Sequence, residues 1–385
     1  MAAPGGFVPR AVFEVSSSIT RSYFLGHHTA ALTSMRKVLS DIGLILECRD
    51  SRVPVTSTNP LLESSLAGRD RIVVYTKADL CAPATATRWL AKQQGLLAEW
   101  HTPSPFPSGS AGGGGGKTEV VFTDERNPRS VARLLELVKD RAAAHDSLLG
   151  LRALVVGMPN AGKSTLLNAL RRVGMRLPAA ARTGSQPGVT RKLSTPVRIV
   201  AAAPSETSGH HLAMGAQDVG EGVFVVDTPG VFVPYVADVE SMLKLSLVGC
   251  VKDGLVPSET VADYMLFLLN RRDPSLYAHL SAPTNHIYEF LDAVAVRTGK
   301  LLKGGVPARE QAADWVVQQW RRGLLGRFGL DDVSEEALKA RARRLALEHG
   351  QGTEPLSMNQ ARKREKEARK VRNAAKRAAS LDSGA

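Results

Sequence analysis

Cysteine and long hydrophobic runs are both scarce in this chain of 385 residues, and each scarcity excludes a class of protein. The three cysteines, Cys48, Cys81 and Cys250, lie far apart and form no C-x-x-C pair. A disulfide framework or a zinc site is therefore not expected, and a reducing compartment fits. No apolar run reaches the length of about 18 residues that a membrane-spanning helix needs. The hydrophobic fraction of 43% is that of a globular protein, and the length allows two domains with tails.

Positive charge, by contrast, is in excess. The formal net charge is +13 and the pI is near 9.9, which indicates a polyanionic partner, either nucleic acid or an anionic membrane surface. The segment from Gln351 to the end holds nine basic and four acidic residues. We expect this segment to be disordered when free and to bind RNA; a merely solvated tail is the alternative.

The segment from Gly157 to Thr165, GMPNAGKST, matches the phosphate-loop pattern G-x-x-x-x-G-K-[ST]. An apolar, β-branched run, residues 151–156, precedes it and strong helix formers follow it, so the motif lies between a predicted strand and a predicted helix. In that setting Lys163 reaches the β- and γ-phosphates as a catalytic residue, and Ser164 places its hydroxyl on Mg²⁺. The alternative is a glycine-rich turn. The nucleotide-binding residues expected from this loop are Asn160, Ala161, Gly162, Lys163, Ser164 and Thr165.

Two further segments belong to the predicted magnesium side of the site. A predicted strand, residues 222–226, leads into Asp227 of the sequence D-T-P-G. This carboxylate can hold Mg²⁺ through water, and the N–H of Gly230 can meet the γ-phosphate. Thr190 lies in a Gly/Pro-rich segment and fits the mobile switch threonine, both as a magnesium ligand and in catalysis; a plain flexible loop is the alternative. The predicted magnesium ligands are therefore Ser164, Thr190 and Asp227.

The base-reading motif stands before both of these in the chain. A third predicted strand, residues 72–75, runs into T-K-A-D, which resembles the [NT]KxD motif of the GTPase superfamily. In that motif the aspartate accepts the guanine N1–H and 2-amino hydrogens, so Asp79 would set the preference for guanine over adenine. A fourth strand, residues 119–122, leads to a segment placed to meet the guanine oxygen. The base-binding residues expected are Thr76, Lys77, Asp79, Phe122 and Thr123.

Because the base-reading motif of the superfamily normally comes last, the order here implies a circular permutation. The expected fold is α/β: a circularly permuted P-loop GTPase domain, then a smaller all-helical domain and a basic tail. Chain ends that lie close together allow such a cut and rejoining. The expected divisions are a targeting segment at 1–22, the GTPase domain at 23–250 with a base-reading half at 30–150 and a phosphate half at 151–250, a helical RNA-contacting domain at 251–335 and the tail at 336–385.

Four more segments extend the resemblance: FLGHH at 24–28, ECRDSRVP at 47–54, LKLSLVGCVKDGLVPSETVADYML and the later GKLLKGG. Together with the nucleotide motifs they resemble the YlqF/RbgA-type permuted ribosome-assembly GTPases, most closely their mitochondrial GTPase 1 branch. The resemblance implies a Mg²⁺-dependent enzyme that converts GTP to GDP and phosphate. It also implies action on the mitochondrial large ribosomal subunit and its rRNA in support of mitochondrial translation, in the matrix or peripheral to the inner membrane.

The resemblance also assigns single residues. The family lacks the catalytic glutamine after D-x-x-G, and Val231 stands at that position here. A histidine of the family's FPGHM motif is proposed to replace the glutamine, which carries over to His27 as a catalytic residue, with His28 beside it where the family usually has Met. Asn160 matches a position that coordinates K⁺ in potassium-stimulated members of the superfamily; a turn-stabilising role is the alternative.

Three functions remain open from the sequence. The first is a GTPase whose hydrolysis is stimulated by ribosome docking. The second is a GTP-dependent RNA-binding scaffold with incidental hydrolysis, because the glutamine is absent. The third is a switch on an anionic membrane that uses the basic tail.

Overall fold

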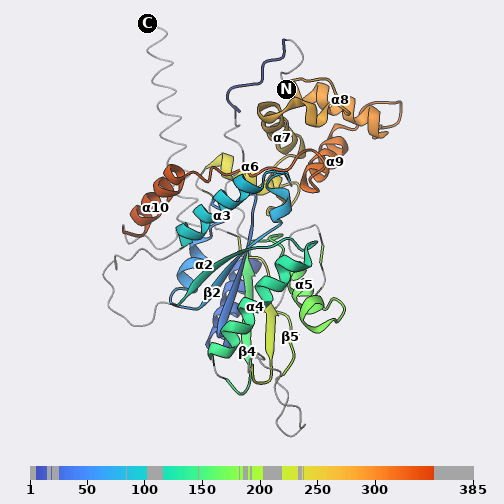
Figure 1. The fold of residues 1–385 in the computed structure, drawn as a ribbon. Helices are drawn as coiled ribbons and strands as arrows, with labels where there is room; N and C mark the ends of the chain where they lie inside the picture. The colour runs from blue at the N-terminus through green and yellow to red at the C-terminus, as the bar shows by residue number, and fades with distance from the viewer. Residues whose placement is uncertain are drawn as a thin grey trace.

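The computed structural model describes residues 6–14, 19, 26–83, 85–101, 116–145, 147–181, 183–184, 190, 193–202, 219–232, 236 and 238–350, without the side chains of 26–29, 61 and 344–350. Figure 1 shows a sheet with helices on both faces and, above it, a group of helices that forms a second part of the molecule. Residues 103–116 and 201–220 lie largely outside the described residues, and the tail beyond residue 350 lies wholly outside them.

The sheet joins the two halves of the permuted domain. Its order is β3-β2-β1-β4-β6-β5, and every strand is parallel to its neighbours except β5, which is antiparallel to β6. The four strands expected from the sequence lie within one residue of their predicted bounds, whereas β1 and β5 occupy segments for which no strand was predicted. The strands are β1 (Leu44–Asp50), β2 (Arg71–Thr76), β3 (Thr118–Phe122), β4 (Leu151–Gly157), β5 (Val197–Val200) and β6 (Val223–Asp227).

Helices cover both faces of this sheet. On one face α4 (Pro128–His145) and α5 (Lys163–Met175) share a core with Leu44 and Leu46 of β1. On the other face α1 (Gly26–Val38) and α2 (Pro60–Ser65) share a core with Ile45, and α3 (Thr87–His101) packs there with α10 (Glu335–Gly350). Successive side chains of a strand point to opposite faces. Burial on both faces therefore explains why β1 is buried along its whole length.

A second core is formed by α6 (Val239–Leu247), α7 (Ser258–Arg272), α8 (Ile287–Thr298) and α9 (Arg309–Arg321). Three of these helices, α7, α8 and α9, lie within the range 251–335 where a helical domain was expected, and Trp320 is buried in the core. The core begins earlier than the expected boundary at residue 251, because α6 packs against α7.

Three loop residues of the sheet domain belong to this helical core. They are Val53 after β1, Met158 in the phosphate loop and Phe232 after β6, and none is more than 2% exposed. Protein interiors are close-packed and transmit displacement rather than absorb it. The loops at this edge of the sheet and the helical core therefore form one packed unit.

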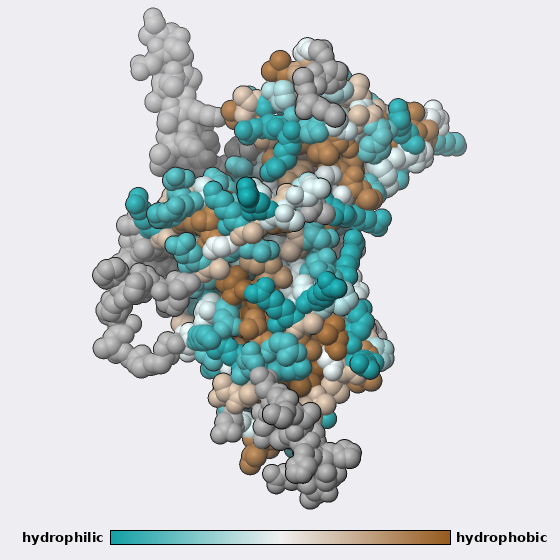
Figure 2. Space-filling view, viewed as in Figure 1, coloured by the Kyte–Doolittle hydropathy of each residue, from teal (hydrophilic) through white to brown (hydrophobic). Residues whose placement is uncertain are grey.

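Part of the expected targeting segment is also folded on the helical core. Arg10 forms an ion pair with Asp263 of α7 at 2.5 Å, and the ring of Phe13 lies 5.3 Å from that of Tyr264 in an edge-on arrangement. The remainder of residues 1–22 lies outside the described part of the chain, apart from residue 19. None of the helices that the structure describes is long and apolar enough to cross a membrane. On the face in Figure 2 hydrophobic residues are scattered among hydrophilic ones.

Asp331, in the segment between α9 and α10, fastens the helical part to the loop after β1. Its carboxylate accepts the backbone N–H of Val55 at 2.9 Å, the backbone N–H of Thr56 at 2.7 Å and the Thr56 hydroxyl at 2.5 Å. Lys244 of α6 lies 3.5 Å away. The side chain of Asp331 is 4% exposed. These hydrogen bonds therefore take the place of the hydration that the carboxylate loses on burial.

Asp331→Ala should therefore lower the free energy of unfolding by about 3 kcal/mol, because buried donors lose charge-assisted partners. Urea denaturation followed by circular dichroism measures this. Glu336→Ala, an exposed acid that follows closely in the chain, serves as the control and should change stability by about 0.5 kcal/mol or less. Equal stability of the two variants would contradict the role assigned to Asp331.

Candidate functional site

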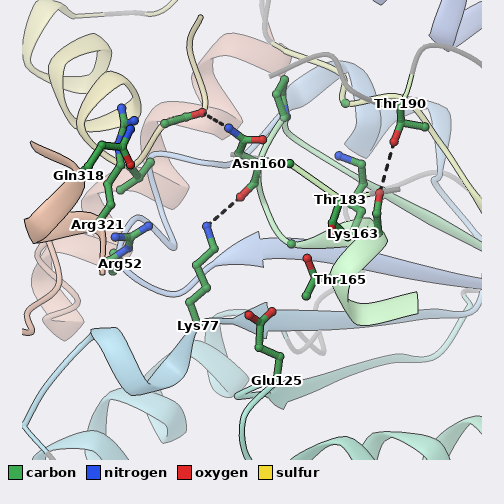
Figure 3. A pocket seen from close by; sticks show the side chains of 17 residues that line it. Arg52, Lys77, Glu125, Asn160, Lys163, Thr165, Thr183, Thr190, Gln318 and Arg321 are labelled. Carbon is green, nitrogen blue, oxygen red and sulfur yellow. Dashed lines mark hydrogen bonds between the residues drawn. The ribbon is translucent and has the colours of Figure 1, made fainter. Parts of the chain in front are cut away.

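A cavity of about 250 Å³ opens where the carboxyl ends of β2, β4 and β6 meet the helical core. Ligands of open parallel sheets bind at this edge. Figure 3 shows Lys163 and Thr190 on one side of Lys77 and Asn160, with Arg52, Gln318 and Arg321 on the other. The lining residues come from both halves of the permuted domain and from the helical part: Arg52, Lys77, Glu125, Pro159, Asn160, Gly162, Lys163, Ser164, Thr165, Thr183, Gly184, Thr190, Gly230, Val248, Gly249, Gln318 and Arg321.

The phosphate loop has the backbone that its glycines require. Gly157 has φ +141°, and a Cβ there would lie 2.2 Å from the carbonyl oxygen of Cys48. Gly162 has φ +85° and begins α5, whose N-terminus faces the cavity. Lys163 is buried and donates to the Met158 carbonyl at 2.8 Å. Burial lowers the pKa of Lys163, with partial compensation by Asp227. The loop thus presents backbone donors and one cation to an anionic ligand.

The three predicted magnesium ligands lie together. Ser164 Oγ donates to Asp227 Oδ2 at 2.5 Å and lies 3.3 Å from Thr190 Oγ1. Asp227 Oδ1 is buried and has no hydrogen-bond partner among the described residues. Burial raises the pKa of Asp227, although Ser164 and Lys163 act in the opposite direction. A buried carboxylate oxygen without a partner beside two hydroxyls fits a small cation that prefers oxygen ligands, such as Mg²⁺.

The D-T-P-G turn packs directly against the phosphate loop. A Cβ at Gly230 would lie 2.6 Å from the backbone of Pro159, so this close approach requires glycine. Val231 donates its N–H to the Gly157 carbonyl at 3.1 Å, and its own carbonyl accepts from Asn59. The Val231 side chain is 2% exposed. An apolar buried side chain cannot orient an attacking water, which agrees with the missing glutamine.

The base-reading motif contacts the phosphate loop. Thr76 Oγ1 donates to the Ala161 carbonyl at 2.9 Å, and Lys77 Nζ donates to the Asn160 carbonyl at 2.8 Å. Lys77 Nζ also donates to Asp50 Oδ2 at 2.8 Å. These bonds join two motifs that are about 80 residues apart in the sequence.

Asp79 lies in a short 3₁₀ turn (Ala78–Leu80) after Lys77 and is half-buried. Burial raises its pKa, and the neighbouring Asp124 adds to this. Thr123 is buried and donates its N–H to the Tyr75 carbonyl at 2.8 Å. The ring of Phe122 stacks on Tyr75 at 4.9 Å. Glu125, which lies just after the segment expected at the guanine oxygen, lines the cavity.

Asn160, the expected potassium position, has φ +54° and lines the cavity. Its Nδ2 donates to the Gly249 carbonyl at 2.8 Å. Gly249 follows α6, so the side chain of the phosphate loop contacts the helical part. A turn-stabilising role and a cation-binding role both remain compatible with this geometry.

His27 lies in the first turn of α1, but its side chain is outside the described part of the structure, as is that of His28. The helix itself is well placed. Leu32 and Met35 of α1 belong to the same buried cluster as Val231. The N-terminal helix therefore packs beside the residue that stands in place of the missing glutamine.

Among the residues that sequence reasoning did not assign are Arg52, Glu125 and Gln318, which line the cavity, and Asp50, which binds Lys77. Asp50 and Arg52 lie in the segment ECRDSRVP that carried the family resemblance, and this was a usable signal. Glu125 and Gln318 have no motif around them. Arg321, a basic residue of the expected RNA-contacting domain, is turned inward and donates to the carbonyls of Leu247 and Ser246.

Comparison with known proteins agrees with this geometry. The family model described as "50S ribosome-binding GTPase" matches residues 152–294. Mitochondrial GTPase 1 of Schizosaccharomyces pombe is 37% identical over 87% of this chain and 96% of its own. Mitochondrial ribosome-associated GTPase 1 of Mus musculus is 31% identical over 84% and 93%. Ribosome biogenesis GTPase A of Priestia megaterium is 29% identical over 82% and 98%.

These matches extend over nearly the whole of each relative and over more than four fifths of this chain. The chain therefore belongs to the family of circularly permuted GTPases that contains mitochondrial GTPase 1 and ribosome biogenesis GTPase A.

Proposed function

We propose that this GTPase acts in assembly of the mitochondrial large ribosomal subunit, and that docking on the particle stimulates its hydrolysis of GTP. The observation that carries the proposal is the shared core of the helical domain and the nucleotide loops, through Val53, Met158 and Phe232. A particle that binds the helical domain can bias the loops only if the two are packed together. The names of the relatives, which refer to mitochondria and to ribosomes, support the partner and the compartment.

The helical domain offers a basic surface for rRNA. Lys303, Arg322 and Arg327 are exposed, and Lys300 is partly buried. The Lys300 ammonium lies over the ring of Trp315, 5.7 Å from the ring centre, in a cation–π contact. Phosphate contacts from such side chains supply most of the affinity of a protein for nucleic acid.

Hydrolysis in this site depends on positioning and charge, because Val231 supplies no polar group. We assign to His27 the orientation of the attacking water, since α1 packs beside Val231. Lys163 and the N–H groups of the phosphate loop hold the phosphates. Positioning accounts for most of catalysis in phosphoryl transfer, so turnover of the free enzyme should be slow.

The residues of the magnesium cluster would hold the ion through Ser164, Thr190 and Asp227. When bound, Mg²⁺ neutralises charge on the β- and γ-phosphate oxygens. Asn160 is the residue that would take K⁺ beside the phosphates, provided that its side chain leaves the Gly249 carbonyl. We place the protein in the mitochondrial matrix, with peripheral contact to the inner membrane as a secondary location.

A second candidate is a GTP-dependent RNA-binding scaffold with incidental hydrolysis. The observation in its favour is the buried Val231, which removes the usual water-orienting side chain. The two functions differ in one result: hydrolysis by a scaffold does not respond to its ribosomal partner.

Asp79→Asn should weaken GTP binding by about 100-fold and improve binding of xanthosine triphosphate, because an amide donor then faces the base where the carboxylate accepted. Competition with a fluorescent GDP analogue measures both affinities. Asp124→Asn, the neighbouring acid that binds the Arg126 N–H, is the control and should keep the guanine preference. Unchanged GTP affinity in Asp79→Asn would place the base elsewhere.

Ser164→Ala should remove the tightening of nucleotide binding by Mg²⁺, with a loss of about tenfold or more, because one oxygen ligand is missing. The measurement is GDP affinity during a Mg²⁺ titration. Thr183→Ala, which lines the same cavity outside the magnesium cluster, should titrate like the wild type. The same Mg²⁺ response in Ser164→Ala and the wild type would exclude the assigned cluster.

His27→Ala should reduce hydrolysis stimulated by mitochondrial large-subunit particles by about 100-fold and leave GDP affinity unchanged, since a group that orients water acts in the chemical step. Single-turnover assays in K⁺ buffer, with and without particles, measure the effect. His28→Ala is the matched control and should retain stimulation. If His27→Ala is stimulated like the wild type, another group orients the water; if no protein is stimulated, the scaffold function stands.

A further inference from the structure

We propose that Asp50 and Arg52 are positioning residues for the base-reading Lys77, and that helix α9 of the helical domain holds both of them in place. The inference rests on the proposed function only in that Lys77 takes part in guanine-nucleotide binding. Neither Asp50 nor Arg52 belongs to the phosphate loop, the D-T-P-G turn or the base-reading motif. Asp50 is the last residue of β1, and Arg52 follows two residues later.

Lys77 is held in an unusual backbone conformation. Its φ is +56°, in the left-handed region that residues other than glycine seldom adopt. Its ammonium is fixed at two points, Asp50 Oδ2 and the Asn160 carbonyl, each at 2.8 Å. The aliphatic stem of Lys77, which would cover the base, is therefore held at its backbone and at its ammonium. Of the two acceptors that hold the ammonium, Asp50 is the charged one.

Asp50 in turn depends on Arg52. The Asp50 side chain is 1% exposed, and Arg52 grips it with Nε at 3.0 Å and Nη2 at 2.8 Å. Burial alone would raise the pKa of Asp50, but Arg52 and Lys77 hold it well below its ordinary value. Removing one member of a buried ion pair leaves the other without compensation. Lys77, Asp50 and Arg52 therefore act as one unit.

The unit of Lys77, Asp50 and Arg52 contacts α9 through Arg52. The Arg52 guanidinium lies 5.0 Å from the ring centre of Trp320, which is buried in the helical core. Arg52 Nη1 has no partner among the described residues, and Arg52 lines the nucleotide cavity. Asp50 is the one carboxylate that binds the Arg52 guanidinium among the described residues. We infer that the indole of Trp320, which packs against the guanidinium, keeps it in this orientation.

The next residue of α9, Arg321, is linked to the phosphate loop through the end of α6. Arg321 donates to the carbonyls of Leu247 and Ser246 at 2.9 and 2.7 Å and so fixes the end of α6. Gly249, two residues on, accepts from the Asn160 side chain. Adjacent residues of one helix thus support the base-reading lysine and the phosphate loop, and Figure 3 shows Arg52 and Arg321 side by side next to Lys77 and Asn160.

The test is a double-mutant cycle read by equilibrium binding of a fluorescent GDP analogue to the full chain, without ribosomal particles. Asp50→Asn should weaken binding by about tenfold, the effect of one charge-assisted hydrogen bond. Trp320→Leu should weaken it by about threefold, although Trp320 lines no part of the cavity. The double variant should lose less than the product of the two, because both act through Arg52.

Two further variants separate positioning from general damage to the core. Trp320→Phe keeps an aromatic face and should restore affinity to within about twofold of the wild type. Trp315→Leu removes the other tryptophan of the same helix, whose ring faces Lys300 instead, and should also stay within about twofold. If Trp320→Leu does not fold, Arg52→Lys tests the same link, since it keeps the charge and loses the fork.

The proposal is overturned if Trp320→Leu and Trp315→Leu bind GDP equally well, or if the effects of Asp50→Asn and Trp320→Leu simply multiply. Neither result would bear on the proposed function, because GDP binding is measured here without ribosomal particles. Conversely, absence of stimulation by ribosomal particles in the wild type would refute the proposed function and leave the cycle fully readable.

Discussion

Parallel pairing of β1 with β4 is the constraint on which the rest of this structure depends. It joins the base-reading half of the chain to the phosphate half, with Cys48 opposite Gly157 at the end where ligands bind. The strands approach so closely there that a Cβ on Gly157 would lie 2.2 Å from the Cys48 carbonyl. The pairing brings the loops after β2 and β4 into contact, with Thr76 Oγ1 2.9 Å from the Ala161 carbonyl. A nucleotide cavity results, although its motifs stand in permuted order.

The same edge of the sheet is where the helical domain is attached. The side chains of Val53, Met158 and Phe232, from loops of the sheet domain, pack in the helical core. Asp331 binds the backbone after β1. Cores are bistable rather than continuously deformable, so a shift on one side is met by repacking on the other. This arrangement gives a physical route by which occupancy of the cavity can alter a surface on α7, α8 and α9. It also explains why α6 shares the helical core.

Much of the site could be predicted because its chemistry is local in sequence. The phosphate loop, D-T-P-G and T-K-A-D each combine a strand with a turn whose residue types permit few alternatives, and the structure brings Ser164, Thr190 and Asp227 together as predicted. The supports of Lys77 could not be predicted in this way. Asp50 lies 27 residues before its lysine, and Trp320 lies far beyond Arg52 in the chain. Only tertiary packing reveals such pairs, and their residue types carry no periodic signal.

The central claim is that the helical domain presents a ribosome-binding surface whose affinity depends on the nucleotide. The most direct test measures binding of the full chain to mitochondrial large-subunit assembly particles with a non-hydrolysable GTP analogue and then with GDP, at one fixed salt concentration. The account predicts that binding with the GTP analogue is about tenfold tighter or more, within the usual range of coupling between two sites. Equal affinity in the two nucleotide states would contradict it.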